Sequence, residues 1–171
     1  DRAAWLDSTL ADFASAGELG RIAYVSADNE INNHCGNGGA DCFDAGPSHD
    51  AQAYLDGAVG WTAQLRAAVK SRAPQVLVTV GITTERADAD GTRAAFDLFK
   101  RATDGRRLAD LSDFLSPHNY SGGAPGVIAD IRVGAGYQGA VVLEEFGFPT
   151  DPAPVSPLWT EGPFSCRLNP W

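Results

Sequence analysis

Four short apolar runs lie within the first 150 residues, separated by segments in which apolar residues recur at helical spacing. The runs are 21–30 (RIAYVSADNE), 75–82 (QVLVTVGI), 113–120 (DFLSPHNY) and 139–147 (GAVVLEEFG). Each is a nearly continuous hydrophobic run rather than a strict alternation, which is typical of strands that are covered on both faces. The pattern therefore predicts four buried β-strands.

The segments between these strands carry apolar stripes typical of helices. The stripes consist of Leu6, Leu10 and Phe13; Leu55, Val59, Leu65 and Val69; Ala95, Phe96 and Phe99; and, after Pro125, Val127, Ile128 and Ile131. Alternating strands and helices predict an α/β fold with a parallel sheet and crossover helices. The Pro-rich segment 151–171 has no periodicity, so we expect one domain over 1–150 followed by a C-terminal tail.

The excess of acidic over basic residues limits the kinds of molecule that the protein is expected to bind. The 171 residues include 22 acidic and 13 basic side chains, a formal net charge of −9, and no run of basic residues. Nucleic acids and anionic membranes are bound by clustered Lys and Arg, so neither is expected as a partner. No apolar stretch reaches the ~20 residues that a membrane helix needs, which predicts a soluble protein.

The cysteines give information on the cellular compartment in which the protein is expected. Cys35 and Cys42 flank a Gly-rich loop, and Cys166 lies in the tail. A local disulfide between Cys35 and Cys42 is the favoured interpretation, with two free thiols as the alternative. A disulfide together with the acidic composition predicts a secreted, extracellular protein. His34 and His49 would complete a zinc set with the two cysteines, but their spacing does not match a familiar structural zinc site, so no metal is expected.

Titratable side chains gather at the ends of the predicted strands, which is where parallel α/β proteins carry their reactive residues. The first strand ends in Asn29 and Glu30, and the last carries Glu144 and Glu145. Two carboxylates that face one cleft are what cleavage of a glycosidic bond requires, one as proton donor and one ionised. Because successive strand residues point to opposite faces, only one of Glu144 and Glu145 is expected in the cleft.

Three motifs follow one another at these strand ends: Asn-Glu at 29–30, His-x-Tyr at 118–120 and Glu-Phe-Gly at 145–147. In this order they resemble the cellulase and mannanase type of (β/α)8 glycoside hydrolase, family five and its clan A relatives. In that family the motifs belong to barrel strands four, six and seven, with one plain strand between the first two, the place that 75–82 occupies. The resemblance implies a partial (β/α)8 TIM barrel of four parallel strands with crossover helices, about half of the full barrel.

The resemblance also implies a reaction. Glu30 would be the general acid/base and Glu145 the nucleophile of a retaining enzyme that cleaves β-linked glycan, of the cellulose, β-glucan or mannan type, without a cofactor. The substrate would be an oligo- or polysaccharide. Glu144 would then point away from the site, into hydrogen bonds or solvent.

Three further residues receive roles from the same family. Asn29 would hydrogen-bond the sugar 2-hydroxyl, Tyr120 would hydrogen-bond the nucleophile, and His118 would line the same sugar subsite. Plainer interpretations stand beside these roles. Glu30 would cap the helix that follows it, and His118 with Tyr120 would form a satisfied buried pair.

The resemblance is incomplete, since a full barrel of this kind takes about 250 residues. The remaining strands would lie on a longer parent chain, and with them the arginine, histidine and tryptophan that they usually supply. Trp159 in the tail is a candidate sugar-stacking platform, the alternative being that it only packs. The alternative function is accordingly a carbohydrate-binding or inactive fragment of such a barrel.

Two other motifs are set aside by their context. The segment 134–139 (GAGYQG) satisfies the dinucleotide pattern G-x-G-x-x-G, but it follows a predicted helix and precedes a strand, the reverse of the required order. It is interpreted as a helix-to-strand turn. Ser116 and Ser121 lie near His118, but the sequence contains no G-x-S-x-G elbow that would indicate a serine hydrolase.

Overall fold

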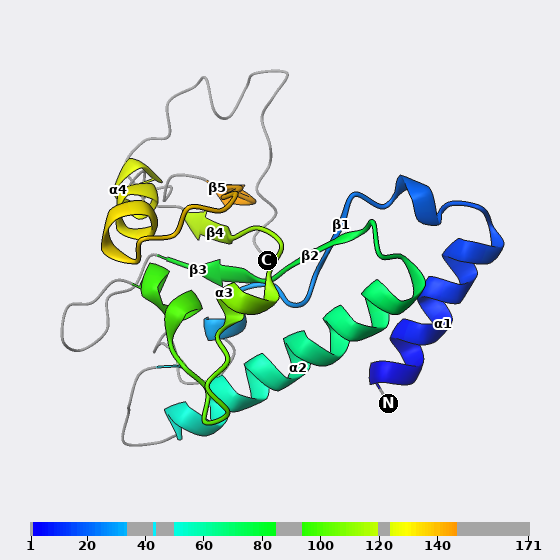
Figure 1. Cartoon of the computed structure of the whole chain (residues 1–171), viewed down its shortest axis with the longest axis horizontal. Coiled ribbons are helices and arrows are strands. Elements are labelled where there is room, and N and C mark those ends of the chain that lie inside the picture. The colour runs from blue at the N-terminus through cyan, green and yellow to red at the C-terminus, as the bar shows by residue number, and fades with distance from the viewer. Residues whose placement is uncertain (1, 34–42, 44–49, 85–93, 120–123, 147–171) are drawn as a thin grey trace, which may run out of the picture.

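The computed structural model describes residues 2–33, 43, 50–84, 94–119 and 124–146. Short parallel strands alternate with helices over these residues, so the fold belongs to the α/β class (Figure 1). The strands are β1 (Tyr24–Ser26), β2 (Leu77–Thr79), β3 (Gly81–Thr83), β4 (Ser116–Asn119) and β5 (Glu145–Phe146). The α-helices are α1 (Arg2–Ser15), α2 (Ala51–Arg72), α3 (Leu108–Leu111) and α4 (Ala124–Ala129). Shorter helical turns are η1 (Leu19–Arg21), η2 (Ile31–Asn33), η3 (Ala94–Phe99) and η4 (Asp130–Gly134).

The strands pair in the order in which they occur along the chain, and every pair is parallel. The predicted strand 75–82 is divided at Val80 into two parts. Its first part, β2, pairs with β1, and its second part, β3, pairs with β4, which in turn pairs with β5. The parallel pairing predicted from the sequence is confirmed, but the described strands form two sheets, β1–β2 and β3–β4–β5, instead of the single sheet expected, and each strand is shorter than the predicted apolar run.

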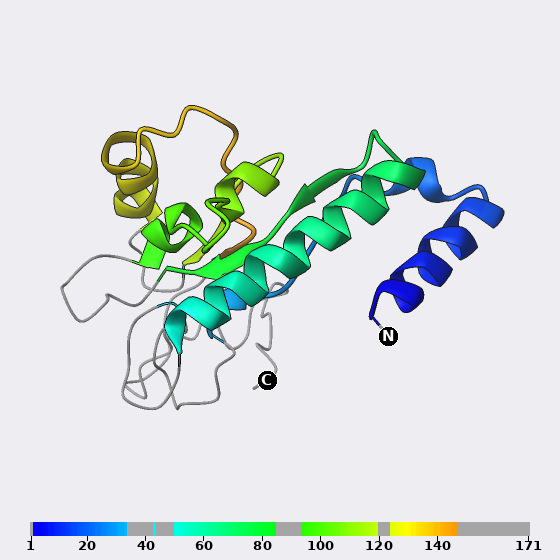
Figure 2. The same cartoon turned by 60° about the horizontal axis from the view of Figure 1, so that its bottom comes forward.

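Helix α2 covers one face of β1 and β2, as Figure 2 shows most clearly. It begins where the side chain of Asp50 accepts a hydrogen bond from the backbone N–H of Ala53, at 3.0 Å, which satisfies one of the free donors of the first turn. The predicted apolar stripe of this helix is buried against the sheet, with Val59 and Val69 fully inaccessible. Burial of this stripe, more than the propensity of its residues, holds the helix in place.

Two of the other predicted stripes need correction. Leu6 and Leu10 of α1 are buried as expected, but Phe13 is 43 % exposed. The stripe around Phe96 and Phe99 forms a 3-10 helix, η3, rather than an α-helix.

The turn at 134–139 is confirmed, because η4 ends at Gly134 and the next sheet contact is at Val141. None of the described helices is long and apolar enough to cross a membrane.

The strand that carries the two glutamates has one extra residue. Leu115 pairs with Val141, and His118 pairs with Glu145. Between these two pairs, the chain of β4 moves on by three residues, from 115 to 118, whereas the neighbouring strand moves on by four, from 141 to 145. An extra residue on one strand is a β-bulge, which bends the strand and interrupts the alternation of its side chains. The rule that neighbouring residues face opposite sides therefore does not hold at Glu144 and Glu145.

Asp113 anchors the segment that leads into β4. Its carboxylate lies 2.7 Å from both Arg66 Nη2 and Lys70 Nζ of α2, and it accepts a hydrogen bond of 2.8 Å from the backbone N–H of Val78. Burial alone would raise the pKa of Asp113, but the hydrogen bonds from Arg66, Lys70 and Val78 outweigh that effect and lower the pKa to about 2.

We expect Asp113→Asn to lower the free energy of unfolding at neutral pH by about 2 kcal/mol, the equivalent of the shift in the pKa. Because the folded pKa is below the unfolded value, this stabilisation is present above about pH 4 and is lost as the pH falls through about 2. Urea unfolding of both proteins across this range would measure it. The matched control is Asp110→Asn, which breaks an exposed ion pair with Arg107 and should cost under about 1 kcal/mol. Equal losses for the two variants would contradict the assignment.

Candidate active site

Three side chains predicted from separate strand ends meet at the carboxyl edge of the sheet. Glu30 follows β1, His118 lies on β4 and Glu145 begins β5. His118 Nδ1 is 3.4 Å from Glu30 Oε1 and 3.7 Å from Glu145 Oε2. One carboxylate oxygen of Glu30 and one of Glu145 lie within 4.8 Å of each other. The structure thus brings together two carboxylates around one buried imidazole.

These side chains differ in their access to solvent. The His118 side chain is 1 % exposed, Glu30 is 18 % exposed and Glu145 is 39 % exposed. A molecule approaching from solvent therefore meets the two carboxylates before it meets the imidazole. The imidazole therefore lies at the floor of the site, and the two carboxylates lie on its solvent side.

The backbone of Glu30 has an unusual conformation. Its φ of 52° lies in the left-handed region, which residues other than glycine enter at a cost of about 1–2 kcal/mol. Strained residues of this kind are held by their surroundings and cluster at functional sites. Glu30 lies in the bend between β1 and η2, and its carboxylate faces His118.

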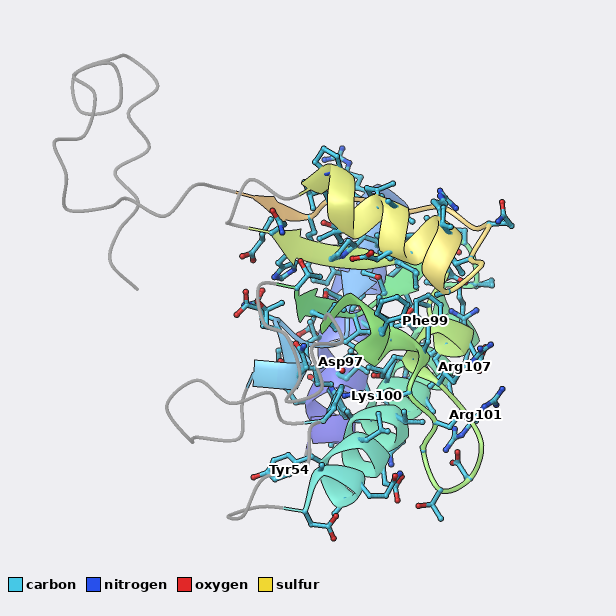
Figure 3. All side chains as sticks on the ribbon, turned by 90° about the vertical axis from the view of Figure 1, so that its left-hand side faces the viewer. Tyr54, Asp97, Phe99, Lys100, Arg101 and Arg107 are labelled. Atoms are coloured by element: carbon cyan, nitrogen blue, oxygen red, sulfur yellow. The ribbon has the colours of Figure 1, made fainter. Side chains whose placement is uncertain are left out.

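A buried polar network fixes the loop that carries Glu30. Asn32 lies two residues further on and is fully buried. Its side chain accepts a hydrogen bond from the N–H of Thr83, donates one to the carbonyl of Thr83, and donates another to Asp97 Oδ2. Asp97, on η3, is also buried and is paired at 2.8 Å with Lys100 (Figure 3). The loop after β1 is therefore tied to the end of β3.

Glu144 is engaged in hydrogen bonds, as predicted, but the prediction that it would point away from the site is wrong. Its carboxylate accepts a short hydrogen bond from Ser116 Oγ, and its Oε2 is 3.6 Å from His118 Nε2. The physical reason is the bulge described above, which lets Glu144 and the next residue, Glu145, both reach the imidazole from the same strand. Three carboxylates rather than two therefore surround His118.

Tyr24 completes the surroundings of Glu144. The hydrogen bond between the Tyr24 hydroxyl and Glu144 raises the pKa of Tyr24, and the negative charge of Glu144 and partial burial act in the same direction. The hydroxyl therefore keeps its hydrogen and donates it. Glu144 thus joins β1, through Tyr24, to β4, through Ser116.

Gly81 makes room for His118. A Cβ atom at Gly81 would lie 2.7 Å from His118 Nε2 and 2.8 Å from its Cε1, closer than real contacts allow. The same Cβ would lie 3.2 Å from the carbonyl oxygen of Asp28, and the N–H of Gly81 donates to that oxygen. The imidazole is therefore stacked directly against the backbone of β3, which a side chain at this position would prevent.

Of the other predicted site residues, only Asn29 lies within the described part of the chain. Asn29 is exposed, and its backbone N–H donates to the carboxylate of the preceding residue, Asp28. Tyr120 and Trp159 lie outside the described residues. So do Cys35, Cys42, Cys166, His34 and His49, and with them the predicted disulfide and the alternative zinc set, as well as the tail 151–171.

Sequence reasoning missed the part that three residues play in the site, although it considered one of them, Ser116, as a serine nucleophile. Ser116 is two residues before His118 on the same strand, and the two-residue period alone would have placed both on one face. Gly81, inside a predicted strand, carried the ordinary signal of a close approach. No sequence signal pointed to Tyr24, because its hydrogen bond to Glu144 joins two residues that are far apart in the sequence and meet only in the folded chain.

The donor atoms of Glu30, His118 and Glu145 also have a spacing that would suit a divalent cation, since all lie within 4.8 Å of one another. The two carboxylates could equally act without a metal, one holding a proton and the other ionised. A chelator separates these two possibilities in the experiment proposed below.

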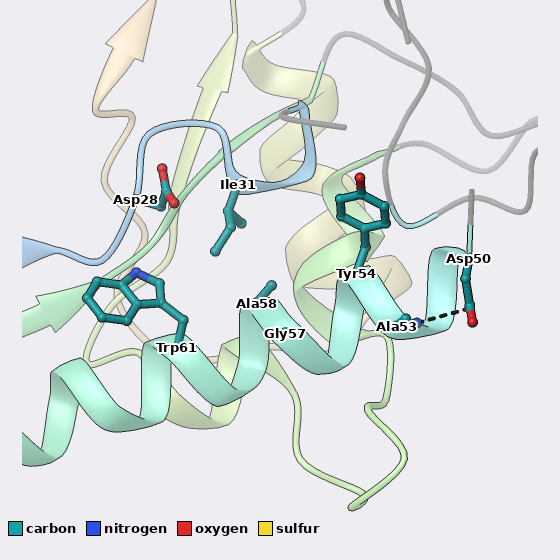
Figure 4. A pocket seen from close by; sticks show the side chains of 8 residues that line it. All are labelled: Asp28, Ile31, Asp50, Ala53, Tyr54, Gly57, Ala58 and Trp61. Carbon is teal, nitrogen blue, oxygen red and sulfur yellow. Dashed lines mark hydrogen bonds between the residues drawn. The ribbon is translucent and has the colours of Figure 1, made fainter. Parts of the chain in front are cut away.

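A separate hollow lies between the loop after β1 and the first half of α2 (Figure 4). Its lining residues include Asp28, Ile31, Tyr54 and Trp61. Neither of the two candidate catalytic residues, Glu30 and Glu145, lines it. Trp61 Nε1 donates a hydrogen bond of 2.8 Å to the carbonyl of Ala27, which fixes the end of β1 on α2. The hollow is therefore distinct from the place where Glu30, His118 and Glu145 meet.

Comparison with known proteins yields no relative. No protein-family model matches the chain, and neither the curated proteins nor the solved structures contain a match.

Proposed function

We propose that this chain forms the catalytic part of a retaining glycoside hydrolase that cleaves β-linked glycan, of the cellulose, β-glucan or mannan type. The observation that carries the proposal is the approach of Glu30 and Glu145, whose nearest donor oxygens lie within 4.8 Å across His118. Retaining glycosidases place their two carboxyl groups about 5–5.5 Å apart, whereas inverting enzymes need about 6.5–9.5 Å to admit a water molecule. Two oxygens within 4.8 Å of each other are compatible with the retaining spacing, and we therefore propose retention.

The proposed reaction has two steps. Glu145 attacks the anomeric carbon, while Glu30 gives its proton to the departing glycosidic oxygen, so that the bond to the leaving sugar breaks as the bond to Glu145 forms. In the second step Glu30 takes a proton from water, the hydroxide attacks the same carbon, and Glu145 leaves as a carboxylate. The two inversions give net retention, and no cofactor takes part.

The fold proposed for this enzyme is a (β/α)8 barrel of which the described strands form about half. Tyr24 and Leu77 are directly opposite each other in the register of β1 and β2, and both are about two-fifths exposed. Large apolar side chains on one face of a sheet are what an unfilled barrel interior would present. The remaining strands, on a longer parent chain, would cover this face. Secretion and the Cys35–Cys42 disulfide remain predictions of the same proposal.

The stereochemistry of the first product tests the proposed function. The parent protein is incubated with a β-glucan or β-mannan oligosaccharide, and the anomeric proton of the new reducing end is followed by NMR before mutarotation. We expect the β-anomer first, at a rate that a chelator does not change. An α-anomer first would show inversion, and loss of turnover with the chelator would assign Glu30, His118 and Glu145 to a metal.

The second candidate is a carbohydrate-binding fragment without turnover, and the open apolar face around Tyr24 and Leu77 favours it. Such a fragment would bind oligosaccharide and release no reducing ends over a long incubation. Release of reducing ends would exclude it.

A further inference from the structure

Glu144 is held from two sides by hydrogen-bond donors. Ser116 Oγ on β4 donates to Glu144 Oε2, and the Tyr24 hydroxyl on β1 is the second donor. The carboxylate is only 17 % exposed. A carboxylate bound in this way is fixed in position, and the retaining mechanism described above gives it no task.

The imidazole of His118 meets Glu144 on one side only. Nδ1 faces the two catalytic candidates, Glu30 and Glu145, whereas Nε2 faces Glu144 at 3.6 Å. Nε2 is buried and has no hydrogen-bond partner among the described residues. At 3.6 Å the contact is longer than a direct hydrogen bond, yet it is close enough for the charge of Glu144 to act on a buried nitrogen.

The kind of group at each end decides where the imidazole carries its hydrogen. A bare nitrogen at Nε2 would bring its lone pair against an oxygen of Glu144, which already accepts hydrogen bonds from Ser116 and Tyr24. A hydrogen on Nε2 would instead be attracted by that oxygen. At the other end of the ring Glu30, the proton donor of the proposed reaction, lies 3.4 Å from Nδ1 and can donate its hydrogen to a bare nitrogen there. The ring has no room to rotate away, because Gly81 lies directly against its Nε2 and Cε1.

We propose that Glu144 is a positioning residue that keeps a hydrogen on Nε2 of His118 and thereby presents Nδ1 to Glu30 and Glu145. The proposal rests on the proposed function, because it gives His118 a task toward those two carboxylates. Nδ1 then accepts a hydrogen bond from Glu30 while Glu30 holds its proton, before that proton leaves in the first step and after it returns in the second. Glu144 acts through His118 and touches no substrate.

The placement of the hydrogen can be measured without any turnover. Imidazole ¹⁵N chemical shifts distinguish a nitrogen that carries hydrogen from one that does not. They are recorded at neutral pH on the ¹⁵N-labelled chain of 171 residues, and the signals of His118 are identified by their loss in His118→Asn. We expect Nε2 to carry hydrogen in the wild type and in Glu144→Gln, whose amide oxygen remains an acceptor, and to lose it in part in Glu144→Leu.

Kinetics in the parent protein provide the second measurement. We expect Glu144→Leu to lower kcat about 10- to 100-fold with KM changed less than about threefold, and Glu144→Gln to recover most of kcat. If Glu144→Leu does not fold, Ser116→Ala replaces it, because loss of this donor frees the Glu144 carboxylate and should shift the ¹⁵N signals in the same direction.

Two outcomes would overturn the assignment: Nε2 without hydrogen in the wild type, or identical ¹⁵N shifts in the wild type and Glu144→Leu. A purely structural role for Glu144 would lower stability without moving the hydrogen. The result is also separable from the proposed function. If the ¹⁵N chemical shifts are as expected but the parent protein shows no glycosidase activity, the placement of the hydrogen on Nε2 of His118 still holds. Only its proposed part in catalysis is then refuted.

Discussion

Replacing Glu145 by Gln should lower kcat on the order of 10⁴-fold or more while the protein stays folded, because the amide cannot attack the anomeric carbon. Gln has nearly the same shape, and Glu145 is 39 % exposed, so little packing is disturbed. The rate of release of reducing ends from a β-glucan or β-mannan measures the loss, and circular dichroism confirms the fold. Unchanged binding of oligosaccharide would show that the variant has lost only the chemical step.

The neighbouring residue supplies a matched control. Glu144→Gln changes the same kind of side chain one position earlier, and it should leave kcat within about tenfold of the wild type because Glu144 acts only through His118. A chemical rescue sharpens the comparison. In Glu145→Gly, azide can occupy the space of the lost carboxylate and attack the activated sugar, giving a glycosyl azide of inverted configuration. Retained activity of Glu145→Gln, or equal losses at both positions, would remove Glu145 from the role of nucleophile.

The order of the sheet could be predicted from the sequence because it depends on local information. Each of the first three apolar runs is followed by a helical stripe. Parallel strands joined by helices place their carboxyl ends at one edge. This reasoning brought Glu30, His118 and Glu145 together from positions up to 115 residues apart. The exact bounds of the strands were beyond it, since pairing ends where the chain turns away, as it does after Ser26.

The arrangement inside the site was predicted less well, and the reason is a single residue. The alternation of side chains along a strand follows from a regular backbone, and the extra residue between Val141 and Glu145 breaks it. Nothing in the letters VVLEEF distinguishes a bulged strand from a regular one. Glu144 was therefore assigned to the wrong direction, although Glu145 was placed beside His118 as expected.

Gly81 offers the second large effect. Gly81→Ala should lower the free energy of unfolding by about 1–3 kcal/mol, because its Cβ would meet the His118 ring at 2.7 Å and the ring, 1 % exposed, cannot move aside freely. It should also lower kcat by up to about 100-fold, since the imidazole would be pushed out of its place between Glu30 and Glu145. Thermal unfolding and the release of reducing ends measure the two effects.

The chain contains a control that should respond in the opposite direction. Gly60 lies inside α2, and a Cβ there would have no atom within 4 Å. Gly60→Ala should therefore raise the free energy of unfolding by about 0.5–1 kcal/mol, because alanine favours the helix and loses less freedom on folding. The same chemical change would then stabilise the protein at one position and destabilise it at the other.

A double-mutant cycle decides whether the loss at Gly81 comes from His118. In a His118→Ala background the ring is gone, and the remaining close neighbour of the new Cβ is the carbonyl oxygen of Asp28 at 3.2 Å. Most of the destabilisation by Gly81→Ala should therefore disappear in that background, giving an interaction energy of about 1–2 kcal/mol. If the loss is the same with and without His118, the imidazole does not lie against β3, and the geometry on which the proposed catalytic roles of Glu30 and Glu145 rest is wrong.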